Sequence, residues 1–399
     1  MSHSEQDPEP GAGGARSKGT RLPQDPQGRD WLTVTSPLLP DADALCADVR
    51  AILESNWVTN QGAYARRLEA ELARYLDVER ALLITNATVA LEMAFLEAIG
   101  DGEVIVPAYS FPATWNLFCE NPRFKPVFVD IGDDFRIDPA AVQAAITPRT
   151  RAIVAVHTYG FLCDHAALAG LCHTHDLTLV YDAAHAFGVS ENGVPVGVLG
   201  DLNIFSFHAT KVYNTLEGGA ITGEPDLLDG LFRRRNFGLE REEQVRFGTN
   251  GKVDEIRAAV GLLNLLQVDD AIARRASVSE HYLEALPAAG LDMLTLYPHE
   301  LRRPGVRHNH SYFPVRVRPD ARLSRDQLLA ALKDHGILAR RYFYPTPTTS
   351  SLYTGMVDPD ALPRTRAASL DTLCLPIHHR MTPADCDHVV ASLRRALRD

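Results

Sequence analysis

The fold is constrained most by a regular alternation of short apolar runs with helical patterns, which begins near residue 78. A helical pattern, "VALEMAFLEAI", follows the first of these runs. The strand-like runs are "RALLIT", "EVIVPAYSF", "PVFVDI", "RAIVAVHTYG", "LTLVYD", "LNIFSFH" and "GAIT". Runs that are apolar on both faces and alternate with helices are typical of a mostly parallel sheet between two helical layers. The sequence therefore predicts an α/β fold.

A second, smaller α/β unit is predicted toward the C-terminus. Residues 253–288 keep a helical apolar spacing, so we expect one or two helices that leave the sheet. Beyond them, strands are expected at 310–317 and 337–343. Helices are expected at 324–336 and 382–398. A large sheet domain followed by a small mixed domain is the resulting prediction.

Three parts are predicted along the 399 residues. Residues 1–30 are rich in Gly, Pro and charge and lack an apolar targeting segment, which indicates a disordered tail. Residues 31–272 would form the large domain, and residues 273–399 the small C-terminal domain. With 45% hydrophobic residues, the chain has enough apolar side chains to bury a large core.

Charge and cysteine usage limit the partners and the compartment. The net charge of −11 disfavours nucleic acid or an anionic membrane as a partner, because both attract basic surfaces. No stretch approaches the roughly 20 apolar residues that span a bilayer. The six cysteines form no CxxC pair, which fits neither a zinc site nor a disulfide framework. We therefore expect reduced cysteines, no metal site and a cytoplasmic protein.

One lysine stands out in a chain that has five lysines and 35 arginines. Lys211 lies in "SFHATKVYNTLEGGAIT", between an apolar run and a pair of glycines. An amine can lose its proton and form a Schiff base with a carbonyl, whereas a guanidinium stays protonated in proteins. Lys211 is therefore a candidate nucleophile. The alternative is an ordinary solvated lysine on a loop.

Ligands of parallel sheets bind beyond the carboxyl ends of the strands, so residues after each run are candidates. Asn86, Ala87 and Thr88 follow "RALLIT" and open a helix, where free N–H groups favour a phosphate. The alternative is that Asn86 or Thr88 only caps the helix. Phe111 follows "EVIVPAYS" and could lie flat on a heterocycle, or it could be a core residue.

Two more strand ends carry polar residues. Asp182 follows "LTLVY" and could hold a proton on a ring nitrogen, or it could cap a helical "AAHAF". His185, one helical turn on, could reach the same ligand or simply be packed. Ser206 and Lys211 follow "LNIF" and could meet a phosphate and an aldehyde, or lie on the surface. Phosphate, ring-face, ring-nitrogen and aldehyde partners together describe a site for pyridoxal 5′-phosphate (PLP).

Four motifs, "NATVAL", "VPAYSFPAT", "YDAAHAFG" and "FSFHATK" with "EGGA", resemble the DegT/StrS family of sugar-nucleotide aminotransferases, which are PLP-dependent enzymes of fold type I. The resemblance covers about residues 31–399. It implies that Lys211 forms the Schiff base and moves the proton. The other roles that it implies are Asp182 on the pyridine nitrogen, His185 near the ring hydroxyl, Ala87, Thr88 and Ser206 on the phosphate, and Phe111 on the ring.

The resemblance also implies a homodimer with shared active sites. The segment "GTNGKVDEIRAAVG" matches the family loop whose asparagine, here Asn250, reaches the phosphate in the neighbouring subunit. Ala87 stands where the family often has glycine, and Lys252 where arginine is also common. The family's dehydratase branch has histidine in place of the lysine, so Lys211 disfavours that branch.

The predicted function is transfer of an amino group from L-glutamate to a nucleotide-linked keto-deoxysugar in bacterial amino-sugar biosynthesis, for an antibiotic or a cell-surface glycan. Segments such as "NWVTNQG" and "ILARRYFYP" resemble members that act on dTDP-4-keto-6-deoxyhexoses. The expected reaction converts dTDP-4-keto-6-deoxy-D-glucose to dTDP-4-amino-4,6-dideoxy-D-glucose. Thr59, Glu217 and Arg340 are candidate substrate contacts, or they are turn and surface residues.

Two other functions are alternatives to transamination. A regulator or scaffold could keep the PLP-type fold and bind a sugar nucleotide without turnover. A nicotinamide-dependent oxidoreductase would also have the sheet, but the chain lacks a G-x-G-x-x-G turn after an early strand.

Overall fold

The computed structural model describes residue 28 and residues 30–398. Its central sheet has seven strands, in the order β2 (Leu82–Ile84), β10 (Gly219–Gly223), β9 (Leu202–Ser206), β6 (Thr178–Asp182), β5 (Thr150–Val156), β3 (Gly102–Pro107) and β4 (Phe124–Val129). Every neighbouring pair is parallel except the two pairs that include β10. This confirms the predicted α/β fold. The predicted tail at 1–30 lies outside the described residues, apart from 28 and 30.

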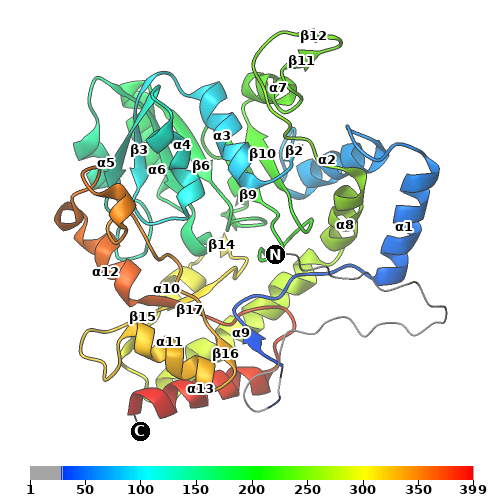
Figure 1. Cartoon of the computed structure of the whole chain (residues 1–399). Coiled ribbons are helices and arrows are strands. Elements are labelled where there is room, and N and C mark those ends of the chain that lie inside the picture. The colour runs from blue at the N-terminus through cyan, green and yellow to red at the C-terminus, as the bar shows by residue number, and fades with distance from the viewer. Residues whose placement is uncertain (1–27, 29, 399) are drawn as a thin grey trace, which may run out of the picture.

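Helices cover both faces of this sheet (Figure 1). One face packs against α3 (Ala87–Ala98), α4 (Asn116–Glu120) and α7 (Pro225–Arg234). The other face packs against α2 (Ala63–Tyr75), α8 (Glu255–Leu265), α5 (Pro139–Ala145) and α6 (His165–His175), with α1 (Ala42–Glu54) outside α8. Side chains alternate along each strand, so Ile204 enters the first layer and Phe205 the second.

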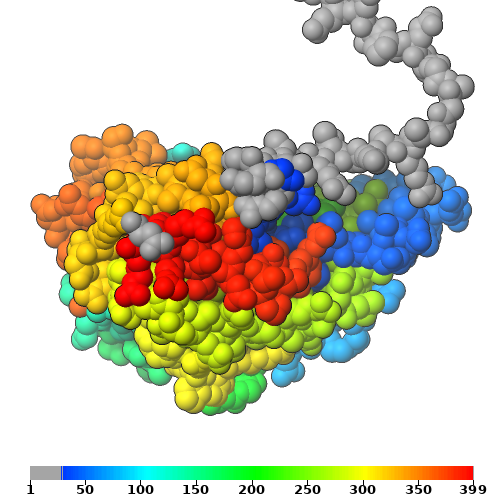
Figure 2. Space-filling view, turned by 90° about the horizontal axis from the view of Figure 1, so that it is seen from below, coloured from blue at the N-terminus to red at the C-terminus, as the bar shows by residue number. Residues whose placement is uncertain are grey.

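The C-terminal unit is a small antiparallel sheet covered by helices. Its strands lie in the order β13 (Leu294–Thr295), β15 (Phe313–Val317) and β17 (Thr372–Leu375). It packs against α9 (Val268–Ala288), α11 (Arg325–Asp334) and α13 (Pro383–Arg398), and Figure 2 shows α9 and α13 side by side. The predicted helices at 324–336 and 382–398 are confirmed, and the strand at 310–317 corresponds to β15. A capping box between Ser324 and Gln327 explains where α11 begins.

The remaining elements are short, and most of them are extended pairs or single turns. Among them are β1 (Leu32–Thr33) with β16 (Ile337–Leu338), β7 (Ser190–Glu191) with β8 (Val194–Pro195) and β14 (Val306–Arg307), and β11 (Leu239–Glu240) with β12 (Glu243–Gln244). The short helices are α10 (Pro298–Leu301), α12 (Pro363–Asp371) and the 3₁₀ turns η1 (Pro112–Thr114), η2 (Thr158–Gly160), η3 (Val196–Val198), η4 (Ser351–Tyr353) and η5 (Pro359–Ala361).

Two sequence-based predictions about local structure are wrong. The predicted strand at 337–343 shrinks to β16, which pairs with β1, whereas the small sheet instead uses β17. The chain leaves the extended form because the carbonyl of Tyr342 accepts hydrogen bonds from the hydroxyls of Tyr109 and Tyr159 in the large unit. The other error is the helical "AAHAF", since residues 183–188 form turns. There the His185 carbonyl accepts hydrogen bonds from the side chains of Asn309 and Ser311. In a helix it would instead accept one from a backbone amide four residues further on.

One apolar cluster spans both units. The cluster around the small sheet includes Tyr109, Phe135 and Tyr159 from the large unit. Helix α9 runs across the predicted boundary between residues 272 and 273, and the division of the chain at that point stays a prediction. All six cysteines are free. Among the helices of the described residues, none combines the length and the apolar composition of a membrane-spanning segment.

Candidate active site

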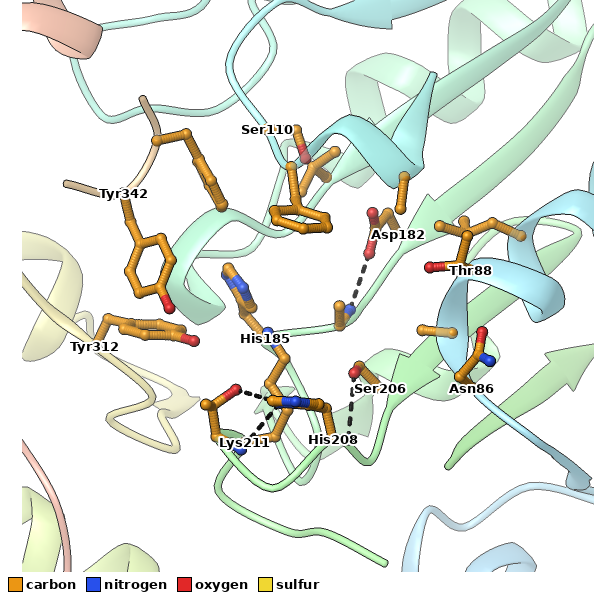
Figure 3. Close-up of a pocket in the computed structure, with 18 of the residues that line it drawn as sticks. Asn86, Thr88, Ser110, Asp182, His185, Ser206, His208, Lys211, Tyr312 and Tyr342 are labelled. Carbon is orange, nitrogen blue, oxygen red and sulfur yellow. Dashed lines mark hydrogen bonds between the residues drawn. The ribbon is translucent and has the colours of Figure 1, made fainter. Parts of the chain in front are cut away.

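A cavity of about 620 Å³ opens at the carboxyl edge of the central sheet (Figure 3). The ends of β2, β3, β6 and β9 all contribute to it, as expected for a parallel sheet. Tyr312 and Tyr342 close it from the small unit. The predicted site residues that line it are Ala87, Thr88, Phe111, Asp182, His185, Ser206, Lys211, Glu217 and Arg340. The structure therefore brings most of the predicted residues together.

One end of the cavity is the N-terminus of α3. Asn86 caps this helix by accepting a hydrogen bond from the Val89 amide at 2.9 Å, which confirms the capping interpretation for Asn86. The amides of Ala87 and Thr88 have no acceptor within the described part of the chain. Ser206, at the end of β9, lies close by in Figure 3 and is buried. Free amides, a hydroxyl and the helix dipole make this end suited to a phosphate.

Asp182 supplies a buried carboxylate to the middle of the cavity. Its Oδ2 accepts a hydrogen bond from the Thr114 hydroxyl at 2.8 Å, and its Oδ1 accepts one from the Ala184 amide at 3.1 Å. Burial raises the pKa of Asp182, while these two hydrogen bonds and the charge of Lys211 act in the opposite direction. The predicted helix cap does not apply, because no helix follows Asp182.

The His185 ring lines the cavity, and its contacts with Tyr159 and Phe343 hold it in one orientation. Its Nδ1 accepts a hydrogen bond from the Tyr159 amide at 3.1 Å, and its ring stacks on Phe343 with the planes 8° apart. Burial lowers the pKa of His185 well below 6.5, so the ring is neutral at pH 7. Because Nδ1 is an acceptor, the ring proton is on Nε2, and His185 can donate one hydrogen bond from that atom.

Lys211 follows β9 in a turn and reaches the cavity floor. Burial lowers the pKa of its amine, against the opposing effects of Tyr342 and Asp182, which favours the neutral and nucleophilic form. Its Nζ lies 5.8 Å from the centre of the Tyr312 ring. A lysine in this position is not an ordinary solvated loop residue.

The glycines of "EGGA" have structural roles beside this lysine. A Cβ atom on Gly218 would lie 2.0 Å from the Thr215 hydroxyl. A Cβ atom on Gly219 would lie 3.0 Å from the Ala87 amide nitrogen. Glycine therefore lets β10 approach the start of α3 closely.

The exposure and position of the other residues distinguish between their two interpretations. Phe111 is 59% exposed at the start of η1, so the interpretation as a core phenylalanine is wrong. Ser206 is 8% exposed, so it is not a surface turn residue. Glu217 lies at the rim, with its carboxylate 3.5 Å from Nε2 of His208. Arg340 also lines the cavity and is exposed.

Thr59 and Asn250 do not line the cavity of their own chain. Both are exposed, Thr59 in the loop before α2 and Asn250 in a single bridge to Asn236. Lys252, next to this loop, places its amine 4.4 Å from the centre of the Phe237 ring.

Sequence reasoning missed several residues that the structure brings to the site. Ser110 and Thr114 lie within the motif "VPAYSFPAT", but hydroxyl spacing there carried no signal of a contact with Asp182. His208 also lines the cavity. Tyr312 and Tyr342 come from the small unit. Their sequence segments, 310–317 and 337–343, predicted strands and gave no sign of a site.

The fold and the cavity together define a PLP-dependent transferase of fold type I. The chain belongs to the DegT/DnrJ/EryC1/StrS aminotransferase family, whose model matches residues 41–394. It is thus a sugar-nucleotide aminotransferase, as predicted, and PLP is its cofactor.

Curated relatives match nearly the whole chain. It is 37% identical to a dTDP-4-amino-4,6-dideoxy-D-glucose transaminase of Shigella dysenteriae, over 90% of this chain and 98% of that protein. It is 34% identical to a GDP-perosamine synthase of Caulobacter vibrioides, over 86% of this chain and 93% of that protein.

Solved structures agree with these relatives. DesI, crystallised with its TDP-sugar product, superposes with a TM-score of 0.85 at 34% identity, covering 92% of this chain and 94% of that one. A sugar aminotransferase of Streptococcus pneumoniae in its PLP form superposes with a TM-score of 0.81 at 25% identity, covering 91% and 97% of the two chains.

Proposed function

We propose that this enzyme transfers the amino group of L-glutamate to C4 of dTDP-4-keto-6-deoxy-D-glucose and forms dTDP-4-amino-4,6-dideoxy-D-glucose in the cytoplasm. The observation that carries the chemistry is the pair of the buried Asp182 and the partly buried Lys211 on one cavity, whose far end is a free helix N-terminus. The relative from Shigella dysenteriae and the TDP-sugar complex of DesI support the choice of sugar nucleotide. Biosynthesis of an antibiotic or a cell-surface glycan is the proposed setting.

The residues present fit the cofactor. Ala87 and Thr88 would bind the phosphate through their amides, and Ser206 through its hydroxyl. Phe111 offers its exposed ring to one face of the heterocycle. When bound, PLP supplies an aldehyde carbon that takes up amines and a ring that withdraws electrons from the carbon that loses its proton.

Three side chains of the protein, Asp182, Lys211 and His185, would hold or move protons at the cofactor. Asp182 would keep a proton on the ring nitrogen, and a carboxylate in a dry site holds that proton more strongly than one in water. Lys211 would hold the aldehyde carbon. As a free amine it would move a proton between the donor carbon and that aldehyde carbon in one half-reaction, and between the aldehyde carbon and the sugar carbon in the other. His185 would donate from Nε2 to the ring hydroxyl.

The substrates would approach at the open side of the cavity. Arg340 is a guanidinium at this rim, and a carboxylate or a phosphate is the group that it would bind. Glu217, beside His208, offers an acceptor for sugar hydroxyls. Thr59 is proposed as a third contact, from the neighbouring subunit, because it lies outside its own chain's cavity.

The substrate is tested by a panel of keto-sugar nucleotides supplied with L-glutamate. We expect the highest kcat/KM with dTDP-4-keto-6-deoxy-D-glucose, measured as 2-oxoglutarate formed and confirmed by the mass of the amino sugar. The Lys211→Ala variant is the control and should form none. A preference for a GDP sugar or a 3-keto sugar would contradict the proposed substrate. A protein that binds PLP but shows no absorbance change with L-glutamate would instead favour the scaffold alternative.

A homodimer with shared sites is the second part of the proposal. Asn250 is exposed, and the resemblance of its loop to the family loop suggests contact with the partner subunit's phosphate. In a mixed dimer of Lys211→Ala and Asn250→Ala chains, one site carries both defects and the other carries neither. Two impaired parents that mix at random should therefore recover roughly one quarter of the wild-type activity.

The control for this experiment is a mixture of the two variants without subunit exchange, which should stay inactive. Recovery should appear only after co-expression or exchange. If Asn250 served its own chain, every site of the mixed dimer would keep one defect. Absence of recovery, with both parents impaired, would contradict the shared site and leave the role of Lys211 untouched.

A further inference from the structure

Asp182 is held by a threonine hydroxyl that has no part in the function proposed above. The turn η1 follows β3, and Thr114 at its end donates a hydrogen bond to Oδ2 of Asp182 at 2.8 Å. Strand β5 lies between β3 and β6 in the sheet, so this bond reaches across a neighbouring strand. Thr114 is fully buried and Asp182 is 4% exposed. The bond is therefore shielded from water, where hydrogen bonds to charged groups are strongest.

A second hydroxyl supports the first. Ser110 Oγ lies 2.8 Å from Thr114 Oγ1, and Ser110 is buried as well. Because Thr114 gives its proton to Asp182, its oxygen is free to accept the proton of Ser110. Hydrogen bonds arranged in such a chain polarise and strengthen one another.

The turn itself is fixed from the small unit. Trp115 follows Thr114, is fully buried, and donates from its indole nitrogen to the Tyr353 hydroxyl at 2.8 Å. The same turn begins with Phe111, the exposed ring at the cavity. One short segment thus presents a ring to the cavity and a hydroxyl to Asp182, and the Trp115 contact limits its movement.

We propose that Thr114 is a positioning residue that keeps the Asp182 carboxylate ionised and aimed into the cavity, with Ser110 reinforcing its hydroxyl. This inference rests on the proposed role of Asp182 at the ring nitrogen. A buried carboxylate prefers to take up a proton, and donors to its charged form oppose that preference. The Ala184 amide is the other donor, so the loss of Thr114 would leave Oδ2 without its hydroxyl partner.

The charged surroundings of Asp182 are simple. Burial raises the pKa of its carboxyl, and the charge of Lys211, across the cavity, opposes that rise. His185, on the same turn, is neutral because burial lowers its pKa. His157, at the end of the neighbouring β5, is also neutral, since burial lowers its pKa to about 3. Thr114 is therefore one of few groups that favour the carboxylate.

The experiment compares Thr114→Val with Thr114→Ser in the full-length protein. Valine keeps the shape and removes the donor, whereas serine keeps the donor and removes a methyl group. Thr222→Val is the matched control, because Thr222 is a fully buried strand threonine whose hydroxyl donates at 2.7 Å to Gly197, away from the cavity. Asp182→Asn completes the set and tests the role on which the inference rests.

Three measurements are made on each variant: the PLP dissociation constant of the cofactor-free protein, the pH dependence of the bound cofactor's absorbance, and the rate of the reaction with L-glutamate. We expect Thr114→Val to weaken PLP binding and slow the reaction with L-glutamate by about 10- to 100-fold, as for loss of a hydrogen bond to a charged group. Its absorbance change should move to higher pH, because the carboxyl takes up a proton more easily. Thr114→Ser and Thr222→Val should stay within about threefold of the wild type.

Three results would overturn the inference. If Thr114→Ser, which keeps the donor, is as impaired as Thr114→Val, the effect does not depend on the hydroxyl donor, and disturbed packing around the turn explains it. If Thr222→Val is equally impaired, loss of general stability explains it. If Thr114→Val matches the wild type while Asp182→Asn is inactive, only the inference about Thr114 fails. An active Asp182→Asn variant would instead remove the proposed role of Asp182 itself.

Discussion

The contact between β10 and the start of α3 allows a direct test of how the phosphate end of the site is built. Gly219 pairs with Ile84 and Ser206 on the two neighbouring strands. An added Cβ atom would lie 2.7 Å from the Phe205 carbonyl oxygen and 3.0 Å from the Ala87 amide nitrogen, whereas ordinary contact begins at 3.4 Å. Both neighbours are backbone atoms, so neither can rotate away. Gly219→Ala must therefore shift the strand, the first turn of α3, or both.

The magnitude follows from the cost of overpacking a rigid site. An extra methyl group in a packed interior costs about 1–3 kcal/mol, and we expect the free energy of unfolding to fall by that amount. If α3 moves to relieve part of this strain, the free amides of Ala87 and Thr88 move with it, away from the phosphate. Since 1.4 kcal/mol corresponds to tenfold in an equilibrium constant, PLP binding should weaken by about tenfold.

Urea unfolding gives the stability, and titration of the cofactor-free protein with PLP gives the affinity. Gly170→Ala is the matched control, because Gly170 lies within α6 and a Cβ atom there would meet no atom within 4 Å. Alanine is the better helix former, so this variant should gain up to about 1 kcal/mol and bind PLP normally. A Gly219→Ala protein with wild-type stability and PLP affinity would refute the close-approach argument.

Two further predictions concern protonation. Asp182→Asn should lower the rate of the reaction with L-glutamate by about two orders of magnitude or more while PLP still binds, and near-normal single-turnover kinetics would contradict this. Burial lowers the pKa of His157 to about 3 and of His310 to about 4, whereas an unfolded histidine titrates near 6.5. Below pH about 6.5 the unfolded chain takes up protons that the folded chain does not, so the free energy of unfolding should fall from there to pH about 4. Urea midpoints that stay constant between pH 7 and pH 5 would contradict it.

The large sheet and most of the site were predictable because their signals are local. Each buried strand ends in a polar or glycine-rich segment, and parallel strands bring such ends to one edge. Asp182 and Lys211 could therefore be assigned to one cavity from their positions after two strands of the same sheet. Chemistry then separated Lys211 from the many arginines, since only an amine can act as the nucleophile.

The rest depended on contacts between residues far apart in the chain. Tyr342 lies more than 180 residues from Tyr159, yet its carbonyl bonds to that hydroxyl, and this contact ends the predicted strand. Thr114 reaches Asp182 across 68 positions of sequence. Side-chain hydrogen bonds of this kind leave no periodic pattern, because they join single residues and not faces of helices or strands.

Contacts of this kind, between residues far apart in the chain, also explain why the two units together form one site. Asn309 and Ser311 of the small unit donate to the carbonyl of His185, at 2.9 and 2.7 Å, and so hold the turn that carries its ring. Arg275, buried on α9, donates in turn to the carbonyl of Ser311 at 3.3 Å. A carbonyl that accepts from two buried side chains cannot turn without breaking both hydrogen bonds, and a buried N–H left without an acceptor costs about 1–3 kcal/mol. The orientation of His185 is therefore set by how the small unit docks, although its ring belongs to the large unit.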